Sequence, residues 1–197
     1  MITTVWVMRV MDALKRADAD GVWAFTPNTF SALLGGIEPN YRKLMLKRLC
    51  DREVLVRAAK GVYVNPVARS QPADVRLGLV PYLRPGEVSY VSLESRLSEV
   101  GAISQITFAL TLMTTGRSHR FVTPWGVIDF THTDRSDPLA GSVHFDEGRH
   151  VPMATVERAY RDLKRVGRNL DLVDIEVLFE VIRKESEDPC VAGPLKP

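Results

Sequence analysis

Proline and glycine residues divide residues 1–67 into short segments, and the positions of these residues constrain the fold more than any other sequence feature. Apolar residues recur at helical spacing over residues 4–17, and the pattern ends near Asp18–Gly21. In the stretch TPNTFSALLGG that follows, Thr26 is a good N-cap and Pro27 suits the first helical position. The pair Gly35–Gly36 then ends the segment. The sequence therefore predicts a helix followed by a short second helix.

A third helix is predicted to begin near Pro39, because apolar residues again recur with a period of 3.6. Those residues are Tyr41, Leu44, Met45 and Leu49. The stretch VLVRAAKGVYVNP follows, with strand-forming residues on both sides of a turn at Ala58–Gly61 and a stop at Pro66. This stretch predicts a β-hairpin. Three helices and a hairpin in this order are typical of a winged helix-turn-helix domain, here residues 1–67.

Basic residues are concentrated in this N-terminal segment. Residues 1–67 contain ten Lys and Arg and six Asp and Glu, a net charge of +4. The rest of the chain contains sixteen basic and eighteen acidic residues, a net charge of −2. Residues 41–60 alone carry seven basic and two acidic residues, a net charge of +5. Such local asymmetry favours a polyanionic partner for the N-terminal part.

The third predicted helix is the candidate DNA-recognition helix, because the second helix of a helix-turn-helix pair enters the major groove. Residues Asn40, Lys43 and Lys47 are spaced to share one face, and Arg42 lies beside them. The residues predicted to face double-stranded DNA are Asn40, Tyr41, Arg42, Lys43 and Lys47, with Arg57 and Lys60 on the hairpin. Asn40 and Arg42 are the best candidates for base contacts, because Asn pairs with adenine and Arg with guanine. The alternative is a winged helix that binds a protein, with a solvated basic face.

The remainder of the chain is predicted to form a second domain. Residues 68–75 are polar, contain Pro72 and are expected to be a linker. Residues 76–186 are expected to form a mixed α/β domain with a small, mainly antiparallel sheet, and 187–197 a flexible tail. Its helices are predicted at residues 92–100, 155–167 and 171–184, and its strands at 106–115 and within 119–133. Residues 134–150 are rich in loop-forming residues. The predicted fold class is α+β.

Four arginines recur at positions i, i+3, i+7 and i+10 from the predicted helix at 155–167 onward: Arg158, Arg161, Arg165 and Arg168. Glu157 precedes Arg161 by four residues, and Arg158 precedes Asp162 by four. One interpretation is therefore a charged helix surface with local ion pairs. The alternative is a second basic contact surface for nucleic acid or for an acidic protein.

Histidines suggest an enzyme as a further alternative. His132 and Asp134 lie two residues apart, and His144 and Asp146 repeat that spacing. No third residue has a recognisable spacing, and the sequence contains neither a phosphate-binding glycine loop nor a nucleophile elbow. The sequence therefore predicts a protein that is not an enzyme and has no cofactor or metal.

The two cysteines, Cys50 and Cys190, have neither a metal-binding spacing nor the pattern of a disulfide framework. No apolar run approaches the ~18–20 residues that cross a bilayer. The N-terminus lacks the cleavage site of a signal peptide. We therefore expect a cytoplasmic protein that does not bind membranes.

Five stretches resemble, in this order, the AbiEi family: GVYVNP, VSLESRLSEVGAISQ, LTLMTTGRS, TPWGVIDFTHT and PMATVERAYRDL. The resemblance extends from the first predicted helix to residue 170. This family comprises the antitoxins of AbiE-type abortive-infection systems, which defend bacteria against phage and are classed as type IV toxin–antitoxin modules. The stretch ATVERAYRDL is similar to a threonine–x–glutamate–arginine element of the family. It departs from the family at Tyr160–Arg161, where leucines are common.

The resemblance implies a two-domain transcriptional regulator and antitoxin. The winged helix would bind inverted repeats in the promoter of its own operon and repress it. The second domain would counteract a nucleotidyltransferase-type toxin encoded downstream, without needing a stable complex with that toxin. The alternative is a general winged-helix regulator whose second domain senses a ligand or dimerises.

Overall fold

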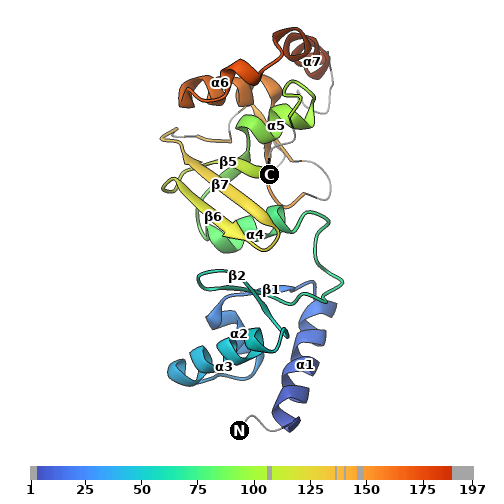
Figure 1. The fold of residues 1–197 in the computed structure, drawn as a ribbon, viewed down its shortest axis with the longest axis vertical. Coiled ribbons are helices and arrows are strands. Elements are labelled where there is room, and N and C mark those ends of the chain that lie inside the picture. Colours follow the sequence, from blue (N-terminus) through green and yellow to red (C-terminus); the bar gives the residue numbers. More distant parts are fainter. Residues whose placement is uncertain (1–3, 106–107, 136, 140, 146–148, 188–197) are drawn as a thin grey trace. The chain divides into compact units, whose positions relative to one another are not determined.

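The computed structural model describes residues 4–105, 108–135, 137–139, 141–145 and 149–187 (Figure 1). These residues form seven α-helices, one short 3-10 helix and nine strands, so the predicted α+β class is confirmed. The chain forms two compact units, Met1–Leu83 and Arg84–Pro197. Within the described residues, no helix has the length and apolar character needed to cross a membrane.

The first unit contains the predicted three helices and hairpin, together with a short first strand and a fourth helix. Its elements are α1 (Thr4–Ala19), β1 (Ala24–Phe25), α2 (Pro27–Leu33), α3 (Pro39–Asp51), β2 (Val56–Ala59), β3 (Val62–Val64) and α4 (Val75–Leu83). The three strands form an antiparallel sheet in the order β1-β3-β2.

Local capping determines where α2 and α3 begin. The Thr26 hydroxyl accepts a hydrogen bond from the Thr29 N–H, and the Thr29 hydroxyl accepts one from the Thr26 N–H, which makes a capping box at α2. Pro27 occupies the first turn as predicted. Helix α3 begins differently, because the Glu38 carboxylate accepts the N–H groups of Asn40 and Tyr41, each at 3.0 Å.

The core of the first unit lies between α1, α2, α3 and the hairpin. Its fully buried side chains include Phe25, Phe30, Leu46 and Leu49. On α3 the buried residues are Met45, Leu46 and Leu49, whereas Tyr41 and Leu44 are 45% and 43% exposed. Helix α3 is therefore oriented so that two of its four periodic apolar residues face solvent.

Helix α4 was not predicted, and it belongs to the first unit. The Tyr82 ring lies 6.0 Å from the Trp23 ring, in an edge-on arrangement, and Gly78 packs directly against Trp23. The preceding segment is also attached, because the Asp18 carboxylate accepts the N–H groups of Arg69 and Ser70. The linker was expected at residues 68–75, and the second domain was expected to start at residue 76. The division between the two compact units falls later, after Leu83.

The second unit contains the predicted helices and a larger sheet. Its elements are β4 (Ser89–Val91), α5 (Leu93–Glu99), β5 (Ala109–Thr114), β6 (His119–Thr123), β7 (Gly126–His132), β8 (Val143–His144), β9 (Met153–Ala154), α6 (Val156–Val166), the 3-10 helix η1 (Leu170–Leu172) and α7 (Ile175–Glu187). Part of the strand predicted at 106–115 lies outside the described residues. Strand β8 lies within residues 134–150, the segment that is rich in loop-forming residues.

The six-stranded sheet is mixed: three of its five strand pairings are antiparallel and two are parallel, so the expectation of a mainly antiparallel sheet is confirmed only in part. Its strand order is β6-β7-β5-β4-β9-β8, and the pairs β5–β7 and β4–β9 are parallel. After β5 the chain runs to the sheet edge as β6 and returns as β7 (Figure 1). Strand β7 inserts between β6 and β5, and this arrangement makes β7 parallel to β5 without a helical crossover.

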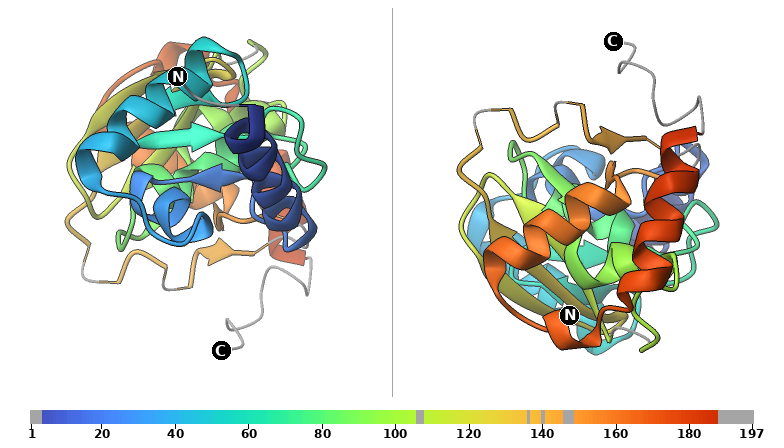
Figure 2. Two further views of the ribbon diagram at one scale, coloured as in Figure 1. Left: turned by 90° about the horizontal axis from the view of Figure 1, so that it is seen from below. Right: turned by 90° about the horizontal axis from the view of Figure 1, so that it is seen from above.

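Helices α5, α6 and α7 lie on one side of this sheet (Figures 1 and 2). Their apolar faces share a core that includes Leu93, Leu97, Ala159, Leu163 and Leu178. Helix α6 is capped by the Thr155 hydroxyl and ends at Gly167, whose φ of 72° is a left-handed conformation that favours glycine.

Candidate nucleic-acid interface on the first unit

A groove runs along α3 beside the hairpin of the first unit and has a volume of about 540 Å³. Its lining residues are Asn40, Lys43, Leu44, Lys47, Cys50 and Asp51 from α3, with Arg57 and Tyr63 from the hairpin. Four of the seven residues predicted to face DNA therefore share one groove: Asn40, Lys43, Lys47 and Arg57.

The other three predicted residues lie outside the groove lining. Tyr41 is exposed on the first turn of α3, and Lys60 is exposed at the turn of the hairpin. The guanidinium of Arg42 donates a hydrogen bond to the Asn28 side chain on α2, with a donor–acceptor distance of 2.8 Å. This bond leaves the charge of Arg42 unneutralised but holds its side chain against α2.

The charge of the groove is positive. Lys43, Lys47 and Arg57 face a single carboxylate, that of Asp51. The Lys47 ammonium lies 2.9 Å from Asp51, and both side chains are more than half exposed, so this pair is weak and opens readily. In the part of the chain that the structure describes, no carboxylate lies within 4.0 Å of Lys43 or Lys60.

The start of α3 carries a negative charge. Because Glu38 accepts the N–H groups of Asn40 and Tyr41, those backbone donors are not free to bind an anion. Phosphate binding in this region therefore depends on the lysine and arginine side chains rather than on the helix terminus.

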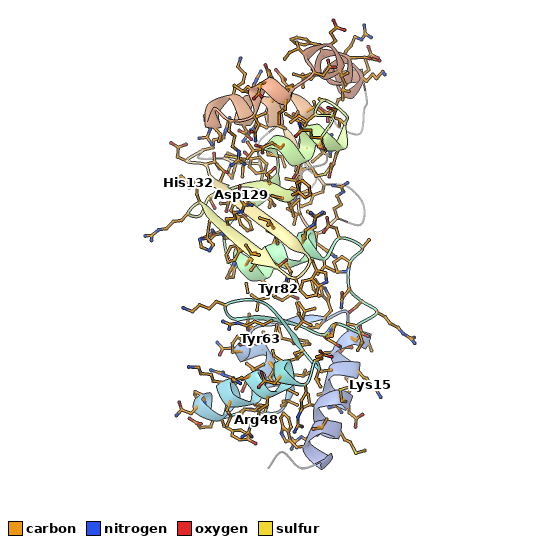
Figure 3. All side chains as sticks on the ribbon, viewed as in Figure 1. Lys15, Arg48, Tyr63, Tyr82, Asp129 and His132 are labelled. Atoms are coloured by element: carbon orange, nitrogen blue, oxygen red, sulfur yellow. The ribbon has the colours of Figure 1, made fainter. Side chains whose placement is uncertain are left out.

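Four residues that line the groove were not predicted as site residues: Leu44, Cys50, Asp51 and Tyr63. Tyr63 is the cross-strand partner of Arg57 and lies between the buried residues Val62 and Val64 (Figure 3). Alternation along the strand VYV could have identified its outward direction. No comparable sequence pattern identifies Cys50 as a residue that lines the groove. Burial raises the pKa of the Cys50 thiol, more than the nearby Arg57 lowers it, so the thiol is protonated at neutral pH and is a poor nucleophile.

The hairpin is irregular at Arg57. The register between β2 and β3 shifts between Arg57 and Ala59, which marks a β-bulge. Bulges redirect side chains at sheet edges. The Arg57 Nε donates to the Ala59 carbonyl at 3.3 Å, and the side chain remains exposed beside the groove.

Two of the four arginines considered as an alternative second basic contact surface, Arg158 and Arg168, are not free to form one. Arg158 is only 6% exposed and pairs with Asp162, which is fully buried. Arg168 pairs with Glu94 and Asp129 and is half-buried. The alternative was therefore wrong for these two residues, because carboxylates from the second unit already neutralise them.

The remaining two arginines of the set are also paired. Arg161 pairs with Glu157, and Arg165 lies 3.4 Å from Asp134. The local ion pairs predicted from i, i+4 spacing, Glu157–Arg161 and Arg158–Asp162, are both confirmed.

Of the two histidine–aspartate pairs, His132 and Asp134 both lie within the described residues, and the Asp134 carboxylate lies 3.4 Å from Arg165. Asp129 and His132 lie along β7 (Figure 3), and the His132 Nδ1 lies 2.8 Å from the Gly116 carbonyl. Asp146 lies outside the described residues. Within those residues, no group of three or more His, Cys, Asp or Glu is arranged to hold a metal ion.

No protein-family model matches the chain, and no curated protein matches it at a significant level.

Proposed function

We propose that the chain is a DNA-binding transcriptional autorepressor and antitoxin of a type IV toxin–antitoxin operon, acting in the cytoplasm. In this proposal the first unit is a winged helix-turn-helix domain that binds inverted repeats in its own promoter. The observation that supports DNA binding most strongly is the convergence of Lys43, Lys47 and Arg57 on one groove beside α3.

The arrangement of α2, α3 and the hairpin suits a duplex. An α-helix fits the major groove of B-DNA, which is about 12 Å wide. With the exposed face of α3 in that groove, Asn40 would lie near base edges and Lys43 and Lys47 near phosphates. Arg57 and Lys60 on the hairpin would contact the adjacent backbone or minor groove. Contacts of Lys and Arg with phosphate supply most of the affinity and make it dependent on salt.

The two proposed base-contacting residues differ in whether a hydrogen bond already holds the side chain in place before DNA binds. Arg42 is already held by Asn28, so it presents its remaining donors from a defined position. Asn40 makes no comparable side-chain hydrogen bond in the described structure. Arg42 is therefore the better-ordered candidate for a guanine contact, and Asn40 would be ordered on binding.

The antitoxin part of the proposal depends on the resemblance to the AbiEi family. The second unit would counteract a nucleotidyltransferase-type toxin encoded beside this chain, with no stable complex required. A general regulator with a ligand-sensing or dimerising second domain remains the competing function. A neighbouring reading frame with a nucleotidyltransferase fold would favour the antitoxin.

A separation-of-function experiment tests the proposal. The full chain and a Lys43→Ala/Lys47→Ala variant are each expressed with a reporter driven by the upstream promoter, and separately with the neighbouring toxin. We expect the wild type to repress the reporter and protect the cells. The variant should lose repression and keep protection, because the substitutions lie on the first unit only. A wild type that neither represses nor protects would refute both halves of the proposal.

A further inference from the structure

Helix α7 presents an apolar face to solvent on the second unit. Its inner side packs on the core through Leu178, Val177 and Val181. On its outer side, Ile175 is 43% exposed and Phe179 is 64% exposed. These two residues are four positions apart and therefore lie one turn apart on the same face.

Two charged residues flank this face. Glu176 and Arg183 are seven positions apart, so they lie along the same edge of α7, two turns from each other. Neither has an oppositely charged side chain within 4.0 Å in the described part of the chain. Three other charged residues of the helix are paired, since Lys184 pairs with Glu180 and Glu185 pairs with Arg96.

The positions of Glu176 and Arg183 are symmetric about the midpoint between Phe179 and Glu180. When two identical helices pack antiparallel around a two-fold axis, residues on the same edge of each helix face one another. With the axis at that midpoint, Glu176 would face the partner's Arg183, and Arg183 would face the partner's Glu176. Phe179 would pack beside the partner's Phe179 at the centre.

We propose that α7 is a homodimerisation surface, on which a second copy of this chain packs in antiparallel orientation. The apolar stripe of Ile175 and Phe179 would be buried, and two ion pairs that a single copy does not make would form at its edge. This inference stands on α7 alone and does not depend on DNA binding. If the proposed function holds, the dimer would carry two first units, one for each half of an inverted repeat.

The mass of the full-length protein in solution tests this inference directly. Sedimentation equilibrium over a range of protein concentrations should give a dimer for the wild type. Phe179→Glu should weaken dimerisation at least tenfold, because it buries a charge against an identical charge at the two-fold axis. Val122→Glu is the matched control, since Val122 is also an exposed apolar residue of the second unit and should tolerate the change.

Charge-reversal variants distinguish a specific dimer interface from non-specific association. Glu176→Arg and Arg183→Glu should each weaken dimerisation severalfold, because each places like charges opposite one another. The double reversal restores both pairs and should return the dimerisation constant to near that of the wild type. Circular dichroism of every variant checks that the fold is intact.

Three outcomes would overturn the inference. The first is a wild type that stays monomeric at every concentration. The second is a dimer that Phe179→Glu leaves unchanged while Val122→Glu disrupts it. The third is a double reversal no better than either single one. None of these outcomes bears on whether the first unit binds DNA, so the two proposals fail independently.

Discussion

The guanidinium of Arg158 and the carboxylate of Asp162 lie 3.3 Å apart inside the second unit, where both side chains are almost completely buried. Asp162 also accepts hydrogen bonds from the Tyr90 and Ser92 hydroxyls, each at 3.0 Å. Arg158 donates to the Tyr90 oxygen at 2.9 Å. This network joins α6 to the strand β4. Its hydrogen bonds offset the desolvation cost of burying the Arg158–Asp162 pair.

Asp162→Ala should destabilise the protein strongly. The substitution leaves the buried Arg158 without its carboxylate, and breaking a buried pair in this way costs about 3–5 kcal/mol. Arg161→Ala is the matched control on the same helix, because the exposed pair of Arg161 with Glu157 contributes at most about 0.5 kcal/mol. Urea unfolding measures both. Equal effects of the two substitutions would mean that the Arg158–Asp162 pair is not buried as described.

Tyr90→Phe should alter the dependence of stability on pH. Burial, with the charge of Asp162 nearby, raises the pKa of Tyr90 to about 12. Between pH 10 and pH 12 the unfolded chain loses this proton and the folded chain keeps it. The free energy of unfolding contributed by Tyr90 therefore falls by about 1.4 kcal/mol per pH unit in this range.

Tyr90→Phe removes this contribution to the free energy of unfolding. It also removes the hydroxyl that donates a hydrogen bond to Asp162. The variant should be about 1–3 kcal/mol less stable than the wild type at pH 7. The difference should shrink as the pH rises above 10, which urea unfolding at several pH values would measure. A difference that stays constant up to pH 11 would contradict the buried position of the Tyr90 hydroxyl.

Gly78→Ala should destabilise the first unit, although glycine-to-alanine changes inside helices normally stabilise by about 1 kcal/mol. A Cβ atom at this position would lie 2.5 Å from Pro72 Cγ and 2.6 Å from Trp23 Cζ2, which are both parts of rigid rings. Such overpacking costs about 1–3 kcal/mol. Thermal unfolding measures the change, and Trp23→Leu in the same chain should relieve it only in part, because the contact with Pro72 remains. A stabilised Gly78→Ala variant would show that α4 does not pack on Trp23.

Glu38→Gln should tighten DNA binding. The glutamine oxygen can still cap α3, whereas the negative charge beside the proposed phosphate contacts is removed. We expect affinity to rise by about two- to fivefold at low salt and the gain to vanish at high salt, because salt screens exposed charges. Fluorescence anisotropy measures this, with Glu157→Gln on α6 as the control for net charge. Equal affinities of both variants and the wild type would place the start of α3 away from the DNA.

Local signals predicted most of the first unit. The two ends of α2 were predicted from Thr26, Pro27 and the pair Gly35–Gly36, because capping and turn formation depend on residues only a few positions apart. Helix α4 escaped prediction because Pro81 interrupts its pattern, and its position is determined by contact with Trp23, which is distant in sequence. The parallel pairing of β5 with β7 was missed for a similar reason, since strand order is a long-range property.

The candidate site was predicted in part. Helical spacing correctly grouped Asn40, Lys43 and Lys47 on one face, which is the face that lines the groove. The same spacing did not show that Leu44 would line the groove as well, because periodicity alone does not fix the rotation of a helix. The pair Arg158–Asp162 was predicted, but its burial depends on Tyr90, which is 68 residues away in the sequence.

Binding of the full-length protein to its own upstream DNA is the most direct test of the central claim that the groove beside α3 binds DNA. The dissociation constant is measured by fluorescence anisotropy at several salt concentrations, for the wild type and for Lys43→Ala/Lys47→Ala, with unrelated DNA as the comparison. The account predicts that the wild type prefers its own promoter. It also predicts that the variant binds all DNA more weakly, with a salt slope smaller by about 2, one for each lost phosphate contact. Equal binding of the wild type to any DNA, or an unchanged affinity and slope in the variant, would contradict it.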